Sequence, residues 1–211
     1  MKRFFVGITG ASGHAYADRL IRALVAAGHA VDLCVTNAGA KVLSHELGVG
    51  DRDASQLERH LEGWLGEAAA SVRVFAPDMV EAPPSSGTAL TGAVILCPCS
   101  MGTLARVAAG FSSNLVERAA DVALKEGRSL VLVPRETPLS EIHLRNLLEL
   151  TRMGAACLPA MPGFYHHPRT MDDLIDHVVG KVLDRVGVEH GGTRWKGDLE
   201  PPEEAGVGTT G

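Results

Sequence analysis

The segment RFFVGITGASGHAYADRL, residues 3–20, sets a pattern that the rest of the chain repeats. Its apolar run, Arg3–Thr9, ends in a turn of small residues, and apolar positions with helical spacing follow over Gly13–Ala27. Gly10 and Gly13 allow a tight turn and a close approach of the backbone to a ligand. The segment therefore predicts a buried strand, a tight turn and a helix, the first unit of a parallel α/β sheet.

The same alternation continues toward the C-terminus. Further strands are expected over Ala30–Thr36, Val72–Phe75, Ala93–Cys97, Ser129–Pro134 and Ala155–Pro159. Helices are expected over Ala38–Leu47, Ser55–Ala70, Thr103–Ala108, Asn114–Lys125, Ser140–Met153 and Met171–Val186. Several strand runs are apolar throughout, which is typical of strands covered on both faces. These elements predict the α/β class, with a three-layer open parallel sheet of Rossmann-like or flavodoxin-like type.

Composition limits the number of domains and the classes of partner. The chain has 211 residues, of which 45% are apolar, enough for one sizeable core. We expect a single domain over residues 1–187 and a C-terminal tail over 188–211, where Gly, Pro and charged residues dominate. A formal net charge of −5 without a basic stripe argues against nucleic acid as a partner. Because no run reaches ~18 apolar residues, we expect a soluble, cytoplasmic protein that does not enter a membrane.

The four cysteines lie in or beside apolar strand runs, so we expect buried free thiols. They are Cys34, Cys97, Cys99 and Cys157. The spacing of Cys97 and Cys99 is not that of a metal site, and no histidine follows at zinc-finger distance. We therefore expect no metal.

Ligands of an open parallel sheet bind at the carboxyl ends of its strands, which directs attention to the turns there. Four turns follow predicted strands: Thr9–Gly13, Thr36–Gly39, Pro98–Thr103 and Pro134–Pro138. In the first, Ser12 and the N–H groups that open the next helix could meet a phosphate, although a tight turn without a ligand would look the same. Glycines at 7, 10 and 13 do not match the dinucleotide pattern GxGxxG, and Asp32 comes too early in its strand to bind a ribose.

The third and fourth turns carry more specific chemistry. Ser100 and Thr103 flank Gly102 at a predicted helix start, where they could bind a phosphate or the polar rim of a flat heterocycle, or simply cap the helix. Arg135 could hold an anion with its planar guanidinium. Glu136 could exchange protons near neutral pH, although a salt-bridged strand end is the alternative for both.

Two more groups could hold an anion. Arg118 and Lys125 lie seven residues apart, so they share a face of one predicted helix, which could equally be a solvated face. Tyr165 lies in a proline-flanked loop after the last predicted strand, and thus also at the ligand edge. Its neighbours His166 and His167 have no third metal ligand at a suitable spacing and are predicted to be surface residues.

Taken together, these residues resemble the UbiX family of flavin prenyltransferases. The similarity covers roughly residues 3–187, and its most specific blocks are ERAADVALKE and LVPRETPLSEIHLRN. It implies an enzyme that binds FMN in a homododecamer, with active sites at subunit interfaces. It also implies transfer of a dimethylallyl group from dimethylallyl phosphate to N5 and C6 of reduced FMN, without a metal, to make prenylated FMN for UbiD-type decarboxylases.

The resemblance also implies roles for individual residues. FMN would be held by Gly10, Ala11, Ser12, Thr36, Ser100, Met101, Gly102, Thr103 and Arg135. The substrate phosphate would be bound by Ser86, Arg118, Lys125, Tyr165 and Lys181. Catalytic roles would fall to Glu136 in proton transfer, to Lys125, and to Ser12 and Glu46 near N5, with Glu46 reaching in from a neighbouring subunit. Trp195, in the tail, would pack against the prenyl group.

This chain departs from the family pattern at two positions, and two other functions stay open. Lys181 stands where the family usually has arginine, which keeps the charge but loses the bidentate grip on phosphate, and Thr36 replaces a common serine. One alternative is a flavin-dependent cysteine-type decarboxylase, although PCSMGTLA replaces the block typical of that class. The other is a non-catalytic FMN-binding or carrier protein, which would not need the second anion site of Arg118 and Lys125.

Overall fold

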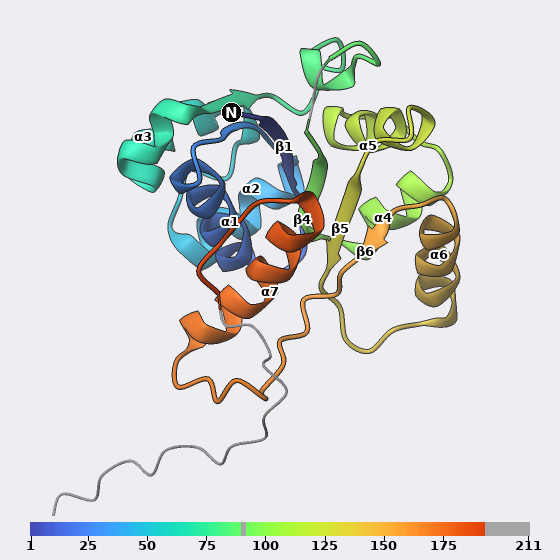
Figure 1. The fold of residues 1–211 in the computed structure, drawn as a ribbon. Coiled ribbons are helices and arrows are strands. Elements are labelled where there is room, and N and C mark those ends of the chain that lie inside the picture. The colour runs from blue at the N-terminus through green and yellow to red at the C-terminus, as the bar shows by residue number, and fades with distance from the viewer. Residues whose placement is uncertain (90–91, 193–211) are drawn as a thin grey trace, which may run out of the picture.

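The computed structural model describes residues 1–89 and 92–192, and it contains a sheet of parallel strands in the order β3-β2-β1-β4-β5-β6 (Figure 1). The strands are β1 (Arg3–Ile8), β2 (Ala30–Val35), β3 (Val72–Phe75), β4 (Val94–Cys99), β5 (Leu130–Pro134) and β6 (Ala156–Cys157). This is the strand order of Rossmann-type folds, in which the sheet grows outward in both directions from β1. The predicted α/β class with an open parallel sheet is confirmed.

Helices connect the strands and cover both faces of the sheet. They are α1 (His14–Ala26), α2 (Asn37–Leu47), α3 (Leu61–Leu65), α4 (Met101–Ala108), α5 (Leu115–Lys125), α6 (Glu141–Arg152) and α7 (Met171–Val186). Short 3₁₀ turns are η1 (Ala54–His60), η2 (Gly66–Ser71) and η3 (Pro83–Ser85). Among the described residues, no helix is long and apolar enough to cross a membrane.

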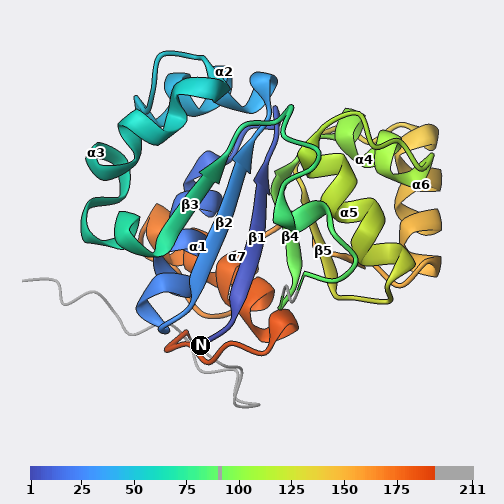
Figure 2. The ribbon, with the colours of Figure 1, turned by 90° about the horizontal axis from the view of Figure 1, so that it is seen from above.

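Helices lie on both faces of the sheet (Figure 2), and an apolar core lies between the sheet and the helices on each face. Alternate residues of β1 divide between them: Phe4, Val6 and Ile8 pack with α1 and α7, whereas Phe5 packs with α4, α5 and α6. Every residue of β2, β4 and β5 is buried, as expected for strands covered on both faces. Val188 still belongs to the first core, so the packed chain continues past residue 187.

Two element predictions were wrong in detail. The helix expected over Ser55–Ala70 is divided into η1, α3 and η2, and Gly66, with φ 58° and ψ −133°, ends α3. The expected strand Ala155–Pro159 pairs over only two residues, although Leu158 and Ala160 still donate N–H bonds to carbonyls of β5. In both places the apolar pattern marks the buried residues, whereas the backbone geometry depends on neighbours that are distant in the sequence.

The cysteines behave as predicted for most positions. All four are free, and Cys34, Cys97 and Cys99 are buried, whereas Cys157 is partly buried. Burial raises the pKa of Cys34 and of Cys99 to about 12, so these thiols stay protonated at neutral pH.

Asp32 has a structural role in the sheet. It lies in the middle of β2 and is only 4% exposed, and its carboxylate accepts hydrogen bonds from Arg3 at 2.9 Å and from Arg73 at 2.9 and 3.0 Å. These guanidinium groups neutralise the carboxylate where it is removed from water. The expectation that Asp32 does not lie at the ligand edge is confirmed.

Thr9 links β1 and β4, the two neighbouring strands between which the strand order reverses. Its hydroxyl donates to the carbonyl of Pro98 at 2.9 Å and accepts the N–H of Ser100 at 2.7 Å, so one buried side chain links the ends of β1 and β4. The switch point of a doubly wound sheet is where such folds bind ligands. Thr9 therefore sets the spacing of the first and third turns.

Replacing Thr9 with valine keeps the shape and removes both hydrogen bonds. We expect Thr9→Val to lower the free energy of unfolding by about 2 kcal/mol, because it leaves the partly buried N–H of Ser100 without its acceptor. The carbonyl of Pro98 keeps one partner, the backbone N–H of residue 9 at 3.2 Å. Denaturant unfolding measures the change. Thr151→Val is the matched control: its hydroxyl bonds Leu147 at 2.8 Å on an exposed helix face, so a change below about 0.5 kcal/mol is expected there. Equal effects of the two variants would contradict the role of Thr9.

Candidate functional site

Four turns meet at the carboxyl edge of neighbouring strands β2, β1, β4 and β5, as the sequence predicts. Contacts tie them together: the Nε of Arg135, after β5, donates to the carbonyl of Ser12, after β1, at 3.1 Å. On the other side, a Cβ on Gly10 would lie 2.8 Å from the Cβ of Ala38, at the start of α2. Glycine is thus required for the close approach of these two turns.

Glu46 closes the N-terminus of α1 within its own chain. Its carboxylate accepts the N–H of Gly13 at 3.0 Å and that of His14 at 2.9 Å. Burial alone would raise the pKa of Glu46, but hydrogen bonds from Ser12, His14 and Gly13 outweigh it and lower the pKa. The helix N-terminus expected to meet a phosphate already holds this carboxylate, and no neighbouring subunit is needed to bring Glu46 to the turn.

The starts of α2 and α4 offer donors instead. Thr36 caps α2 by accepting the N–H of Gly39 at 3.1 Å, and Ser100 caps α4 by accepting the N–H of Thr103 at 3.3 Å. The earlier N–H groups of each first turn, including those of Met101 and Gly102, have no acceptor among the described residues. Backbone donors at two neighbouring helix starts suit a phosphate or the carbonyl edge of a flat heterocycle.

An ion pair between buried Glu117 and half-exposed Arg106 holds the start of α4 in place. Glu117 is completely buried on α5, where its carboxylate accepts hydrogen bonds from Arg106 and Ser113. Burial alone would raise the pKa of Glu117, but these hydrogen bonds outweigh it and lower the pKa. Arg106 also donates to the hydroxyl of Thr103 at 3.4 Å, and Ser100 donates to the same hydroxyl at 3.1 Å. The Thr103 proton is therefore directed toward another acceptor.

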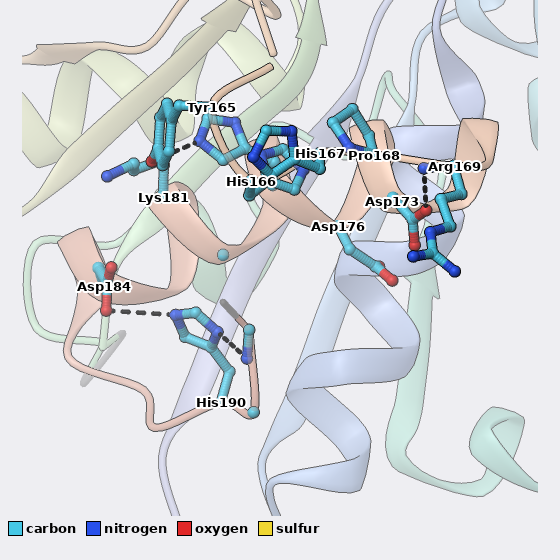
Figure 3. Close-up of a pocket in the computed structure, with 14 residues that line it drawn as sticks. Tyr165, His166, His167, Pro168, Arg169, Asp173, Asp176, Lys181, Asp184 and His190 are labelled. Atoms are coloured by element: carbon cyan, nitrogen blue, oxygen red, sulfur yellow. Dashed lines mark hydrogen bonds and ion pairs between the residues drawn. The ribbon is translucent and has the colours of Figure 1, made fainter. Parts of the chain in front are cut away.

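A cavity of about 570 Å³ lies beside α7 and contains the predicted Tyr165 and Lys181 (Figure 3). The hydroxyl of Tyr165 contacts Nε2 of His177 at 3.0 Å, and the ring of His166 stacks on that of His177 with centroids 4.9 Å apart. His166 was predicted to be a surface residue, which is wrong: both ring nitrogens are buried in this stack. His167 is exposed, as predicted. Within residues 1–89 and 92–192, no three histidine, cysteine or acidic side chains gather as a metal site.

The remaining phosphate candidates lie elsewhere. Lys125 ends α5 and pairs with Glu126 at 3.4 Å, and the carbonyl of Ser86 accepts a hydrogen bond from Arg128, two residues before β5 begins. Lys125 and Ser86 are therefore at the amino edge of the sheet, about 16 Å from the carboxyl end of five-residue β5. Arg118, near the start of α5, pairs with Asp121 at 3.2 Å on the opposite face of the sheet from α7.

One chain thus brings together only part of the predicted site. The turn residues and Glu46 gather at one edge, with exposed Glu136 next to Arg135, whereas Ser86, Arg118 and Lys125 lie apart from Tyr165 and Lys181. Trp195 lies outside the described residues. Sequence reasoning missed His177, although it precedes Lys181 by four residues on one predicted helix and so shares its face.

Fold and site define a nucleotide-binding α/β protein, and the family model named Flavoprotein matches residues 1–183. The flavin prenyltransferase UbiX of Halalkalibacterium halodurans is 49% identical over 193 residues, 91% of this chain and 92% of that protein. The chain belongs to the UbiX family of flavin prenyltransferases.

Two solved structures share the fold over nearly their whole length. AnUbiX (PadA1) in complex with FMN and dimethylallyl pyrophosphate matches with a TM-score of 0.81 and 38% identity, over 93% of this chain and 98% of that one. A dodecameric FMN-dependent UbiX-like decarboxylase from Escherichia coli O157:H7 also has a TM-score of 0.81, with 42% identity over 92% of this chain and 100% of that one.

The ion pair behind α4 gives a pH-dependent contribution to stability. We expect Glu117→Gln to lower the free energy of unfolding at pH 7 by about 2 kcal/mol, because Arg106 and Ser113 lose a charged acceptor. The pKa of Glu117 is lowered by folding, so its contribution is present above the ordinary carboxylate pKa and is lost as the pH falls through the folded-state pKa. Denaturant unfolding across this pH range measures both effects.

Glu141→Gln provides the control for that measurement. Glu141 pairs with Arg145 on the surface of α6, where both side chains are more than 70% exposed. Such pairs contribute at most about 0.5 kcal/mol. A Glu117→Gln effect as small as this one, or one that does not shrink at acidic pH, would show that the buried carboxylate is not stabilising.

Proposed function

We propose that the protein is a flavin prenyltransferase that joins the dimethylallyl group of dimethylallyl phosphate to N5 and C6 of reduced FMN. The gathering of Ser12, Thr36, Ser100 and Arg135 at the carboxyl edge of four neighbouring strands carries this proposal. Reduced FMN, when bound, supplies the electron-rich nitrogen and ring carbon that accept the group. The near-complete match to named flavin prenyltransferases supports this chemistry.

The residues present fit FMN on structural grounds. Backbone N–H groups that have no acceptor within residues 1–89 and 92–192 open α2 and α4, and Gly10 lets the first turn approach α2 closely. Ser12, Thr36, Ser100–Thr103 and Arg135 would hold the cofactor from these turns. The carboxylate of Glu46 is held by the N–H groups of Gly13 and His14, so Glu46 would orient Ser12 near N5 of the flavin.

The chain supplies cations for the leaving group. Breaking an allylic carbon–oxygen bond leaves positive charge on carbon and negative charge on phosphate, which Arg118, Lys125 and Lys181 would stabilise. Ser86 and the Tyr165 hydroxyl would add hydrogen bonds to the phosphate. Glu136, exposed beside Arg135, would accept the ring proton released when the second bond forms. The indole of Trp195 would shield the prenyl carbons.

We further propose that each active site draws residues from several copies of the chain. Lys125 and Ser86 lie at the amino edge and Tyr165 at the carboxyl edge of the same sheet, so a single chain does not surround one phosphate with them. Helix α6 exposes Ile142, Leu144 and Leu148, each more than half exposed, and apolar faces of this kind mark contact surfaces. A homododecamer, like the dodecameric UbiX-like decarboxylase of E. coli O157:H7, would bring the edges together.

The cellular setting follows from the proposed product. Prenylated FMN would pass to a UbiD-type decarboxylase as recipient. Free thiols on the described strands fit a reducing compartment, so we place the protein in the cytoplasm.

One observation weighs against the cysteine-type decarboxylase. A histidine early in the chain would be the catalytic group of that class, but His14 is fully buried and its Nε2 contacts the carbonyl of Thr9 at 3.0 Å. Burial lowers the pKa of His14, which keeps the imidazole neutral and makes Nε2 a donor to this carbonyl. His14 therefore braces the first turn instead of facing a ligand.

Anaerobic incubation with reduced FMN and dimethylallyl phosphate tests the reaction directly. We expect mass spectrometry of the released flavin to show a gain of one five-carbon unit. Glu136→Gln should bind FMN with unchanged affinity but form the final product at least ~100-fold more slowly, because the proton acceptor is gone. Glu62→Gln, at an exposed position of α3, serves as the control. Unmodified flavin with the wild type, or full turnover by Glu136→Gln, would refute the respective claim.

Mixed oligomers test whether sites lie between copies. Lys125→Ala and Tyr165→Phe should each be nearly inactive alone. If one site takes these residues from different chains, co-expression in equal amounts restores about one quarter of wild-type activity, the share of sites that keep both residues. A mixture of Lys125→Ala with the Lys125→Ala/Tyr165→Phe double variant is the control and stays inactive. No recovery in the first mixture would place both residues in one chain's site.

A further inference from the structure

We propose that His177 is a positioning residue that makes the Tyr165 hydroxyl a hydrogen-bond donor toward an anionic oxygen bound in the cavity beside α7. This inference rests on the proposed function for the identity of the anion, the phosphate of the prenyl donor. It assigns a task to a side chain that neither the motifs nor the resemblance singled out.

The hydrogen bonds of His177 fix which ring nitrogen carries the proton. Its Nδ1 lies 3.1 Å from the backbone N of Gly163, and a backbone N–H can only donate, so Nδ1 must be an acceptor. In the neutral imidazole the proton is then on Nε2. Nε2 lies 3.0 Å from the Tyr165 hydroxyl oxygen, which therefore accepts this bond and directs its own proton away from His177.

The surroundings keep His177 in this neutral form and orientation. The ring of His166 stacks on it with an interplanar angle of 8°, and Tyr165 meets both rings edge-on (Figure 3). Burial lowers the pKa of His177, and the nearby His166 and Lys181 lower it further. A second proton would also have to sit on Nδ1, where it would face the N–H of Gly163.

The result is a donor arrangement suited to an anion. Lys181 follows His177 by one helical turn, and its ammonium and the Tyr165 phenol belong to the same cavity. A phenol that donates and an ammonium both stabilise an anionic oxygen, whereas a phenol that accepted from the ligand would not. Because Lys181 offers one point charge, the direction of the Tyr165 proton adds the geometric selectivity that a lysine lacks.

Binding of inorganic phosphate and of dimethylallyl phosphate to the FMN-loaded protein tests the proposal without turnover. We expect His177→Phe, which keeps the ring and its stack, to weaken both affinities about 5-fold, and His177→Gln, which restores a donor, to recover most of the loss. Tyr165→Phe should weaken binding about 10-fold. Adding His177→Phe to it should have no further effect, because both substitutions remove the same hydrogen bond from the Tyr165 hydroxyl to the anion. His60→Phe, on η1 away from the cavity, is the matched control.

Nitrogen-15 spectra of the histidine rings provide a readout that a merely structural role would not move. The wild type should show His177 as the Nε2–H tautomer at neutral pH. An Nδ1–H tautomer, phosphate affinities equal to wild type in His177→Phe, additive losses in the double variant, or no measurable phosphate binding by the wild type would each overturn the proposal. Failure of the prenyl transfer assay alone, with these results as expected, would refute the proposed reaction and not the role of His177.

Discussion

The two hydrogen bonds of the Thr9 hydroxyl are the constraint on which the site depends. They join β1 to β4, where the strand order reverses. Strands β2 and β3 lie on one side of β1, and β4, β5 and β6 lie on the other. The N–H that Thr9 accepts belongs to Ser100, and the Ser100 hydroxyl caps α4. The Nε2 of His14 donates a hydrogen bond to the carbonyl of the same threonine. The bond to Pro98 is buried and the bond from Ser100 is partly buried, so the first and third turns keep one relative position. The donors at the start of α4 are therefore oriented before a ligand binds.

Charge is distributed so that the two proposed anion sites stay separate. The N-terminus of α1 is neutralised by Glu46, and the charge of Arg106 by Glu117, so neither competes for a ligand anion. The open starts of α2 and α4 lie beside Arg135 on one side, and Lys181 with Tyr165 lines the cavity on the other. In one chain Arg118 and Lys125 lie apart from that cavity. An enzyme that binds a flavin phosphate and a leaving phosphate at once needs such a division, because one shared pocket would bind either anion in the wrong place.

Local patterns predicted the parts of this fold that local forces decide. β1, β2, β4 and β5 were found because strands covered on both faces are mostly apolar, and their turns followed from the rule for parallel sheets. The break after α3 and the contact between Glu46 and Gly13 were not found. The first depends on one glycine conformation, and the second joins residues 33 positions apart in the sequence. His166 was misjudged because its burial comes from stacking on α7, which its own sequence neighbours do not reveal.

The position of Lys125 shows why a complete site could not be read from one chain. Helix α5 runs back from the carboxyl edge to the amino edge, so its last residue must lie a strand's length from Arg135 whatever rotamer it adopts. A lysine side chain spans roughly 6 Å, too little to cross that distance. Lys125 can therefore contact a phosphate bound near the flavin only if another copy of the chain places its amino edge beside the turns. Assembly would then add Lys125 of another copy to the site that binds the leaving phosphate. Because Glu46 already occupies the N-terminus of α1, the cofactor phosphate would be left to the starts of α2 and α4.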